Sequence, residues 1–242
     1  MADTKNLHFN VNSIFLLEKY SMGKELSAFN KIDEIKGIYT AEKGTLRCIA
    51  IQLSSGNLCL YSPVQGLSTI AKESLKSLGK VTHLLAPNHY HNKGLEEYSK
   101  AFPEAKLCCT QNANPRLKKQ TALSFSSLKE LEPSLPDTIC FVEPLGLKTG
   151  EVWIKKFQEN QVSWIVTDAF CGPKVTKKLY AEQPELLGTF PSYGIADRQV
   201  YFDWLTQQVR MASPNMIIPC HGSILSAEHL GTSTLKLIEA LL

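Results

Sequence analysis

The sequence predicts a layered α/β fold built on mixed β-sheets. Three observations lead to this prediction: apolar β-rich runs alternate with segments of helical periodicity, tight turns join several of the runs, and the 242 residues are 43% hydrophobic. Interleaved strands and helices are typical of layered α/β folds, and hairpins indicate that the sheets are not purely parallel. A chain of this length and apolar content can bury a large core, and we expect one domain over residues 1–242.

The first half of the chain begins with a predicted β-hairpin followed by a helix. The β-rich runs 45–53 and 58–62 are joined by the turn sequence Ser-Ser-Gly-Asn. Ser68 is a suitable N-cap for the helix that follows, and Gly79 suits its C-terminal end. The next predicted elements are a strand over 81–87, a polar loop over 88–94, a helix over 95–102 and a strand over 105–110, whereas the basic stretch 111–132 matches no regular pattern.

The second half is predicted to add a further hairpin, a short strand and two helices. A turn at Glu159-Asn160 joins two strands that contain Trp153 and Trp164, and we expect both indoles to pack in the core. The predicted elements are strands over 138–143, 151–158 and 162–167, a helix over 197–212, a strand over 216–220 and a final helix over 232–242.

Charge and hydropathy argue against several classes of function. The chain has 26 Lys and Arg against 23 Asp and Glu, and a net charge of +3 is too small to indicate a nucleic-acid or membrane partner. No apolar run approaches the roughly 18 residues of a membrane span. Residues 1–8 lack the charged-then-apolar layout of a signal peptide. We therefore expect a cytoplasmic protein, and any small-molecule substrate has to be inferred from a site rather than from composition.

The seven cysteines favour reduced, buried thiols over a disulfide framework. Their number is odd, they form no CxxC pair, and most lie inside apolar strand-like runs. They are Cys48, Cys59, Cys108, Cys109, Cys140, Cys171 and Cys220.

Candidate chemistry gathers where apolar strands open into loops, which is where α/β folds place their sites. His89 and His91 follow one strand, Asp168 ends the strand 163–167, and His221 ends the strand 216–220. In an extended segment His89 and His91 project to the same side and could chelate one ion. Two solvated loop histidines and an aspartate that caps a turn remain the alternative interpretation. No role is assigned to His8, His83 and His229.

Taken in order, three segments resemble the metallo-β-lactamase fold superfamily: LLAPNHYHNKGLEEYSKAFPEAKL (84–107), LKTGEVWIKKFQENQVSWIVTDAF (147–170) and IIPCHG (217–222). In that family a strand-loop-helix segment carries a His-x-His-x-Asp-His motif, a later hairpin leads into a strand that ends in a bridging Asp, and a late strand ends in His-Gly. The resemblance extends over roughly residues 45–225 and implies an αββα sandwich, with two mixed sheets face to face and helices outside. The sequences LYSP (60–63), APN (86–88) and IVTD (165–168) are similar to an uncharacterised branch of the superfamily.

The resemblance implies four metal ligands. His89 and His91 match the first two histidines of the motif, Asp168 matches the bridging aspartate, and His221 matches the last histidine. Two histidines and a carboxylate are enough for a mononuclear ion with open positions, such as Zn, Fe or Mn. His221 is then either a fourth ligand or an acid or base.

Three of the family's seven usual ligands are replaced. Lys93 and Gly94 stand where the motif has its Asp and its third His, and Leu147 stands where the family has the histidine before the hairpin. An ammonium about 5 Å from a divalent ion is repelled by several kcal/mol at an effective dielectric constant near 20. If Lys93 points inward, a two-metal centre is therefore disfavoured, and Lys93 could stabilise negative charge that develops in a reaction.

The resemblance thus implies a metal-dependent hydrolase with a reduced site, in which Asp168, His221 and Lys93 carry the chemistry. One alternative is a non-catalytic pseudoenzyme that keeps the fold as a ligand- or partner-binding scaffold. A second is a thiol-based redox protein that uses Cys171 and Cys220, which lie next to the predicted site in sequence. The basic cluster of Arg116, Lys118 and Lys119 is either an anion contact near the cleft or a solvated loop.

Overall fold

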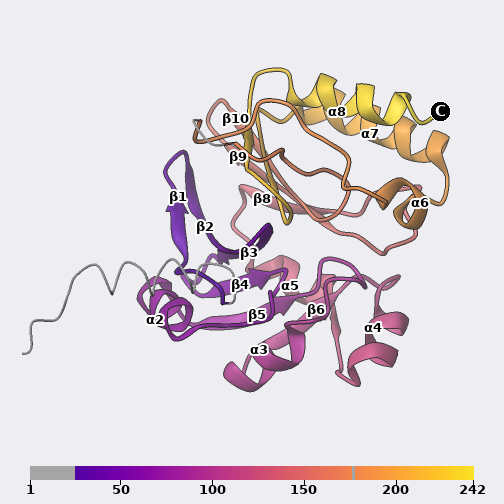
Figure 1. Cartoon of the computed structure of the whole chain (residues 1–242). Helices are drawn as coiled ribbons and strands as arrows, with labels where there is room; N and C mark the ends of the chain where they lie inside the picture. Colours follow the sequence, from indigo (N-terminus) through magenta and orange to yellow (C-terminus); the bar gives the residue numbers. More distant parts are fainter. Residues whose placement is uncertain (1–24, 176–177) are drawn as a thin grey trace, which may run out of the picture.

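Two facing β-sheets lie between two layers of helices in the computed structural model, which describes residues 25–175 and 178–242 (Figure 1). The two mixed sheets of the predicted αββα sandwich are confirmed. None of the helices in the described residues is long and apolar enough to cross a bilayer. His8 and the segment 1–8 considered above lie outside the described residues.

The first sheet has seven strands in sequence order from β1 to β7. Strands β1 to β4 pair antiparallel, and strands β4 to β7 pair parallel. In the parallel part, the C-terminal ends of β4 and β5 lie at one edge, together with the residues that follow them. The strands are β1 (Asn30–Ile32), β2 (Ile35–Lys43), β3 (Leu46–Gln52), β4 (Leu58–Tyr61), β5 (Val81–Leu85), β6 (Lys106–Cys109) and β7 (Ser126–Ser127).

The second sheet has five strands in the order β12-β11-β10-β9-β8. Strands β10 and β11 are parallel, and the other pairs are antiparallel. The ends of β10 and β11 therefore also meet at one edge. The strands are β8 (Ile139–Val142), β9 (Trp153–Gln158), β10 (Gln161–Val166), β11 (Met216–Pro219) and β12 (Leu225–Ser226).

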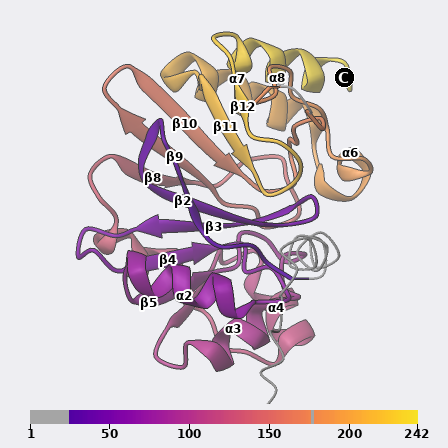
Figure 2. The same ribbon diagram turned by 60° about the vertical axis from the view of Figure 1, so that its left-hand side comes forward.

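Helices cover the outer faces of both sheets, as the two views show (Figures 1 and 2). Helices α2 and α3 lie on the first sheet, and α7 and α8 lie on the second. The helices of the described residues are α2 (Thr69–Leu78), α3 (Leu95–Ala101), α4 (Asn114–Thr121), α5 (Leu128–Leu131), α6 (Phe190–Gly194), α7 (Arg198–Ala212) and α8 (Leu230–Glu239), with a 3₁₀ turn at Glu132–Ser134.

Alternation of apolar side chains along the strands builds a core between the sheets and a core under the helices on each outer face. In β3, Ile49 and Ile51 face the second sheet, whereas Cys48 and Ala50 face α2 and α3. Strand β10 follows the same rule, because Ile165 joins the core between the sheets while its neighbours pack under α7 and α8. The runs are apolar on both faces because each sheet is covered on both faces.

Both predicted hairpins are confirmed. Strands β3 and β4 pair antiparallel across the turn after Gln52, and β9 and β10 pair antiparallel across a turn with Glu159 at positive φ. Ser68 accepts a hydrogen bond from Ala71 N as the N-cap of α2. The predicted core positions Trp153 and Trp164 are fully buried, with ring centroids 5.7 Å apart.

Two regions differ from the prediction. Residues 111–132, which match no regular sequence pattern, contain α4, β7 and α5, and a capping box formed by Ser127 and Glu130 begins α5. Residues 30–43 form β1 and β2 at the start of the first sheet. Strand β2 is half exposed and carries Gly37, so its apolar alternation is weak in the sequence.

Candidate metal centre

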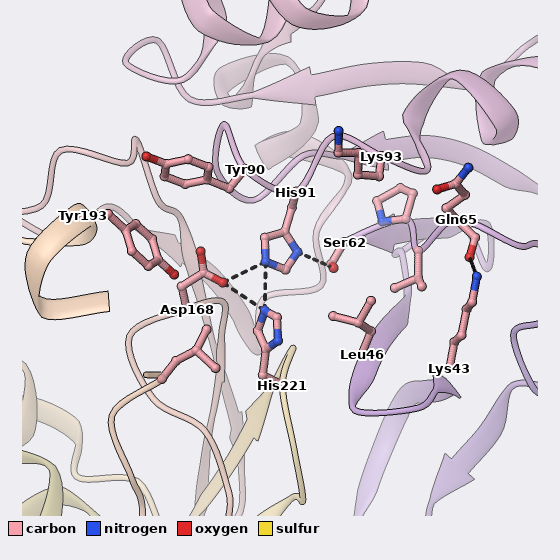
Figure 3. Close-up of a pocket in the computed structure, with 13 residues that line it drawn as sticks. Lys43, Leu46, Ser62, Gln65, Tyr90, His91, Lys93, Asp168, Tyr193 and His221 are labelled. Carbon is pink, nitrogen blue, oxygen red and sulfur yellow. Dashed lines mark hydrogen bonds and ion pairs between the residues drawn. The ribbon is translucent and has the colours of Figure 1, made fainter. Parts of the chain in front are cut away.

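Four strand ends meet at the edge between the two sheets. Ser62 follows β4 and the loop with His91 follows β5, while Asp168 follows β10 and His221 follows β11. Since each of these strand pairs is parallel, their C-terminal ends point the same way. The four side chains line a cavity of about 600 Å³ (Figure 3).

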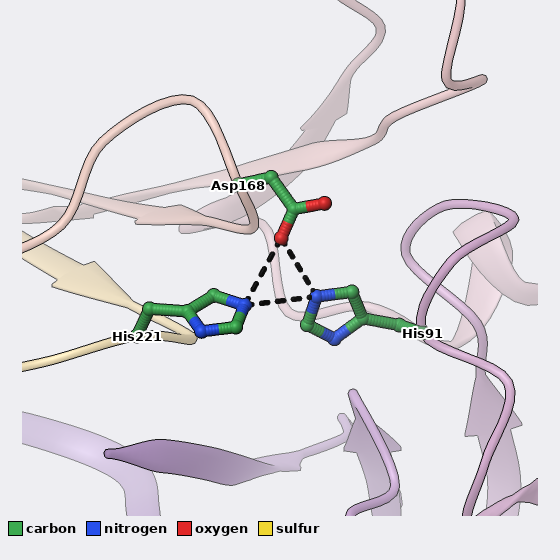
Figure 4. A group of neighbouring side chains, drawn as sticks. All are labelled: His91, Asp168 and His221. Atoms are coloured by element: carbon green, nitrogen blue, oxygen red, sulfur yellow. Dashed lines mark hydrogen bonds and ion pairs between the residues drawn. The ribbon is translucent and has the colours of Figure 1, made fainter. Parts of the chain in front are cut away.

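Three side chains converge at the floor of this cavity. The Nε2 atoms of His91 and His221 lie 2.8 and 3.1 Å from Oδ1 of Asp168, and 3.3 Å from each other (Figure 4). All three atoms lie within 4.8 Å of one another, which makes this the group of described residues suited to hold a metal ion. The sequence-predicted residues His91, Asp168 and His221 are thus brought together.

Asp168 is a buried carboxylate held by hydrogen bonds on both oxygens. Its Oδ2 accepts from Asn88 Nδ2 at 2.9 Å, and its Oδ1 faces the two imidazoles. Burial by itself would raise the pKa of Asp168, but the charges and hydrogen bonds of His91 and His221 outweigh burial and hold its pKa far below the usual range. Asp168 is therefore ionised at neutral pH.

Asn88 also shapes the loop that carries His91. Its Oδ1 accepts hydrogen bonds from the backbone N–H groups of Tyr90 and His91 at 2.8 and 3.1 Å. One side chain therefore fixes the loop conformation and orients the carboxylate of Asp168.

Ser62 holds the opposite side of the His91 ring. Its Oγ lies 2.8 Å from His91 Nδ1, so that Nε2 faces Asp168 and His221. Ser62 is buried and adopts a φ of 58°, in the left-handed region that few non-glycine residues occupy. Such backbone conformations cluster at functional sites.

The His221 loop is fixed against the first sheet. The buried guanidinium of Arg47 donates to the carbonyl oxygens of Pro219 and Gly222, which flank His221. Gly222 packs on Gly172 of the loop after Asp168, and a Cβ on Gly222 would lie 2.1 Å from the Gly172 oxygen. This close approach of two glycines keeps Asp168 and His221 side by side.

The structure does not bring His89, a predicted metal ligand, into the group. Its Nε2 lies 3.1 Å from Nη1 of Arg116, whose guanidinium stacks on the Tyr90 ring. Because arginine can only donate, the lone pair of Nε2 is engaged by this bond. Burial, and next the charge of Arg116, lower the pKa of His89 to about 4. His89 is thus a neutral imidazole turned toward a cation.

The structure places the three residues at which the resemblance implies that usual ligands are replaced. Lys93 is exposed at the rim of the cavity, with its ammonium directed away from the triad (Figure 3). A Cβ on Gly94 would lie 2.3 Å from the oxygen of Pro63, so no larger side chain fits there without moving the turn after β4. Leu147 is partly buried and packs against the core under α7.

A buried carboxyl group lies behind Asp168. Oε1 of Glu151 accepts hydrogen bonds from Trp153 Nε1 at 2.7 Å and from the backbone N–H groups of Thr167 and Asp168, whereas its Oε2 has no hydrogen-bond partner among the residues that the structure describes. Burial and then the charge of Asp168 raise the pKa of Glu151 to about 7. Glu151 is thus an acid whose protonation depends on the charge state of the site.

The two cysteines of the thiol alternative do not line the cavity. Burial raises the pKa of Cys220 well above its usual range, and burial and Glu185 raise that of Cys171 to about 11. Both groups are thiols at neutral pH, and reactive cysteines have the opposite shift.

The donor set and its spacing fit a metal ion. In a tetrahedral zinc site with metal–ligand distances of about 2.0–2.1 Å, two ligand atoms lie roughly 3.3 Å apart. The three separations in the triad are 2.8, 3.1 and 3.3 Å, so a small outward shift of Asp168 would make room for an ion. Two imidazoles and one carboxylate are also a set that Zn and Fe(II) accept.

Sequence reasoning did not assign a role to Ser62, Asn88 or Glu151, nor to Tyr193, which lines the cavity. Ser62 and Asn88 also follow the ends of strands, so the rule that found Asp168 and His221 could have found them. Glu151 lies two residues before Trp153 at the start of an apolar run, where a charged residue is unusual and could have been noticed. Tyr193 lies in α6, a short helix with no clear periodicity.

No protein-family model and no curated protein matches the sequence. Solved structures do match the fold. A metallo-β-lactamase from Hirschia baltica aligns with a TM-score of 0.61 at 10% identity, over 89% of this chain and 98% of its own. A metallo-β-lactamase from Pontibacter korlensis gives 0.56 at 11% identity, over 89% and 99%.

A further match is the metal-soaked flavodiiron core Flv1 from Synechocystis sp. PCC6803, with a TM-score of 0.59 at 12% identity, over 90% of this chain and 62% of its own. These three proteins resemble the chain in fold at only 10–12% sequence identity. The chain therefore has the metallo-β-lactamase fold.

Proposed function

We propose that the protein is a metal-dependent hydrolase with a mononuclear centre held by His91, Asp168 and His221. The observation that supports this most directly is the convergence of two Nε2 atoms and one carboxylate oxygen within 4.8 Å at the floor of a cavity. Three protein ligands that leave coordination positions open are typical of catalytic rather than structural sites. The cavity of about 600 Å³ has the size of a small-molecule site.

The ion and the residues around it would have separate roles in this proposal. A divalent ion held by His91, Asp168 and His221 would lower the pKa of a bound water and polarise a carbonyl or phosphoryl oxygen. Asp168 contributes a full negative charge, because its neighbours keep it ionised. Ser62 and Asn88 fix the orientation of His91 and Asp168. His221 acts as a ligand in this proposal, since its Nε2 faces the same point as that of His91.

Metal content is the first test. Protein purified without added metal is analysed by elemental mass spectrometry, then again after incubation with Zn, Mn or Fe(II) and desalting. We expect close to one ion per chain, and loss of the ion in His91→Ala and Asp168→Ala. His89→Ala is the matched control, because this histidine lies in the same loop but faces Arg116; it should keep the ion.

The outcomes distinguish a metal site with three ligands from one with four ligands and from a site that binds no metal. No bound metal under any condition overturns the proposal. Loss of metal in His89→Ala as fully as in His91→Ala means that the loop rearranges and that all four sequence-predicted ligands take part. If metal binds as expected, a screen of esters, thioesters and phosphodiesters with the loaded protein and with Asp168→Ala tests hydrolysis itself.

A non-catalytic scaffold is the second candidate, and one observation favours it. His91 and His221 both lie within hydrogen-bond distance of Asp168, so the three polar groups satisfy one another without an ion. On this alternative the cavity binds a ligand or partner without turnover. Ligand affinity that is unchanged by chelator and by His91→Ala would support it.

A further inference from the structure

A hydroxyl, an imidazole and a carboxylate lie in line at the floor of the cavity. Oγ of Ser62 is 2.8 Å from Nδ1 of His91, and Nε2 of the same ring is 2.8 Å from Oδ1 of Asp168 (Figure 3). All three side chains line the cavity of about 600 Å³. A hydroxyl, a base and a group that orients the base, each within hydrogen-bond reach of the next, are the geometric signature of an activated serine.

The partners of His91 fix the direction of these hydrogen bonds. Asp168 is ionised and can only accept, so Nε2 of His91 carries the hydrogen. Nδ1 then has the free lone pair, and the hydroxyl of Ser62 donates to it. The two ring nitrogens are exchanged relative to serine proteases, but either nitrogen of a neutral imidazole can act as the base. His91 is therefore in the tautomer that can accept the proton of Ser62.

The backbone at Ser62 presents the hydroxyl on a strained turn. Three non-glycine residues in the described ranges have a positive φ, and two of them end a helix or form a hairpin turn: Ala122 follows α4, and Glu159 joins β9 to β10. Ser62 instead lies between β4 and α2, and it lines the cavity. A strained serine between a strand and a helix is the way in which one large class of hydrolases exposes its nucleophile.

A second hydroxyl–imidazole pair shows what sets Ser62 apart. Oγ1 of Thr82 lies 3.0 Å from Nδ1 of His83. In the part of the chain that the structure describes, however, the histidines that pair with a carboxylate are His91 and His221, both with Asp168. His83 thus lacks the partner that would fix its tautomer and stabilise its protonated form, and neither Thr82 nor His83 lines this cavity.

We infer that the metal-free protein is a serine esterase in which Ser62 is the nucleophile, His91 the base and Asp168 the group that orients the base. Oγ of Ser62 attacks the carbonyl carbon of a carboxylic ester, and its proton passes to Nδ1 of His91. The bond to the alcohol oxygen then breaks, the alcohol leaves with that proton, and the acyl group stays on Oγ. Water attacks the acyl group along the same proton path, which releases the acid and restores Ser62.

This inference goes beyond the proposed function, because it needs no ion. An ion bound to Nε2 of His91 would move the ring hydrogen to Nδ1, which would then donate to Ser62 instead of accepting from it. Metal occupancy and serine reactivity are therefore mutually exclusive at this site.

Covalent labelling tests the inference without turnover. Protein treated with a chelator and desalted is incubated with an alkyl fluorophosphonate, which phosphonylates an activated serine with loss of fluoride. Intact-protein mass spectrometry gives the rate, and peptide mapping gives the site. We expect one label per chain, on Ser62, and slowing by about 100-fold in His91→Ala and in Asp168→Asn. Incubation with 4-nitrophenyl butyrate should likewise add one butyryl group at Ser62.

Matched variants separate the nucleophile from the fold. Ser62→Gly should abolish labelling although glycine tolerates the φ of 58°. His89→Ala, in the same loop as His91, and Thr82→Ala should both be labelled like the unaltered protein. Labelling at another residue, no labelling at all, or labelling of Ser62 that is unchanged in His91→Ala overturns the inference.

Added Zn separates the two proposals. If the ion binds as proposed, saturating Zn should slow labelling by about 100-fold, as loss of the base does. Protein that binds no metal but is labelled at Ser62 contradicts the proposed function and supports this inference. Protein that binds one ion but is not labelled after removal of the ion does the reverse.

Discussion

His89 and His91 lie two residues apart in one loop, yet their surroundings are opposite. The imidazole of His89 faces the cation Arg116, and its pKa is lowered to about 4. The imidazole of His91 lies between the hydroxyl of Ser62 and the carboxylate of Asp168. A His-x-His spacing thus produces one imidazole that stays neutral beside a cation and one whose Nε2 faces a carboxylate.

The difference shows that the partner on each ring decides what a histidine can do. Ser62 and Asp168 are presented by strand ends from the two different sheets, and they meet His91 at the edge between them. Arg116 comes from α4, a helix outside this edge, and reaches His89 from the other side of the loop. Three predictions test how far these surroundings, rather than the sequence spacing, define the site.

The largest effect is expected from Glu151, the buried acid behind Asp168. Its pKa is raised to about 7, so the folded metal-free protein is destabilised as pH rises from about 4.5 to 7 and stays destabilised above that range. Glu151→Gln keeps an oxygen for Trp153 Nε1 and removes the charge. We expect it to stabilise metal-free protein by on the order of 3 kcal/mol at pH 8 and to have little effect at pH 4.

Urea unfolding at both pH values measures this difference. Glu143→Gln is the control, because Glu143 is a carboxyl group outside the site whose pKa is also raised, mainly by partial burial. A loss of stability in Glu151→Gln at pH 8 would mean that the negative charge of Glu151 supports the fold.

A smaller effect is expected from Ser62, which distinguishes the surroundings of His91 from those of His89. Ser62→Ala removes the hydroxyl at Nδ1 and leaves the ring free to turn. Loss of such a partner typically reduces metal affinity 10- to 100-fold, and we expect about tenfold here. Competition with a chromophoric chelator measures the affinity.

Ser62→Gly separates the hydroxyl from the backbone, because glycine tolerates the φ of 58° at this position. If the hydroxyl matters, both variants lose affinity, although Ser62→Gly relieves the backbone strain. Unchanged affinity in both would show that Asp168 and His221 orient His91 without help from Ser62.

Much of the site follows from the sequence, because strand ends can be recognised there. Asp168 and His221 each follow a short apolar run, and the parallel pairing that joins those runs is the usual one for such segments in α/β folds. The role of His89 could not be predicted. It depends on Arg116, 27 residues away in a segment with no regular pattern, and side-chain contacts between distant segments leave no local signal. The same holds for Gly94. A side chain there would collide with the backbone oxygen of Pro63, which lies on a different segment of the chain.

The smallest effect, and the most direct test of the comparison, is expected from Arg116. Arg116→Gln removes the cation that faces His89, so the pKa of His89 should rise from about 4 but stay below 6.5, because burial is the larger cause of its depression. A histidine whose folded pKa is lowered costs stability as pH falls from 6.5 to 4, and this loss should become smaller in the variant. NMR titration of the His89 ring measures the pKa, and Lys118→Gln on the same helix controls for net charge. His89→Ala should leave the metal affinity of the unaltered protein unchanged. If His89→Ala reduces metal affinity in the Arg116→Gln background, then Arg116 alone keeps His89 out of the centre. If the pKa of His89 stays at about 4, burial is sufficient, and the two histidines differ by depth rather than by partner.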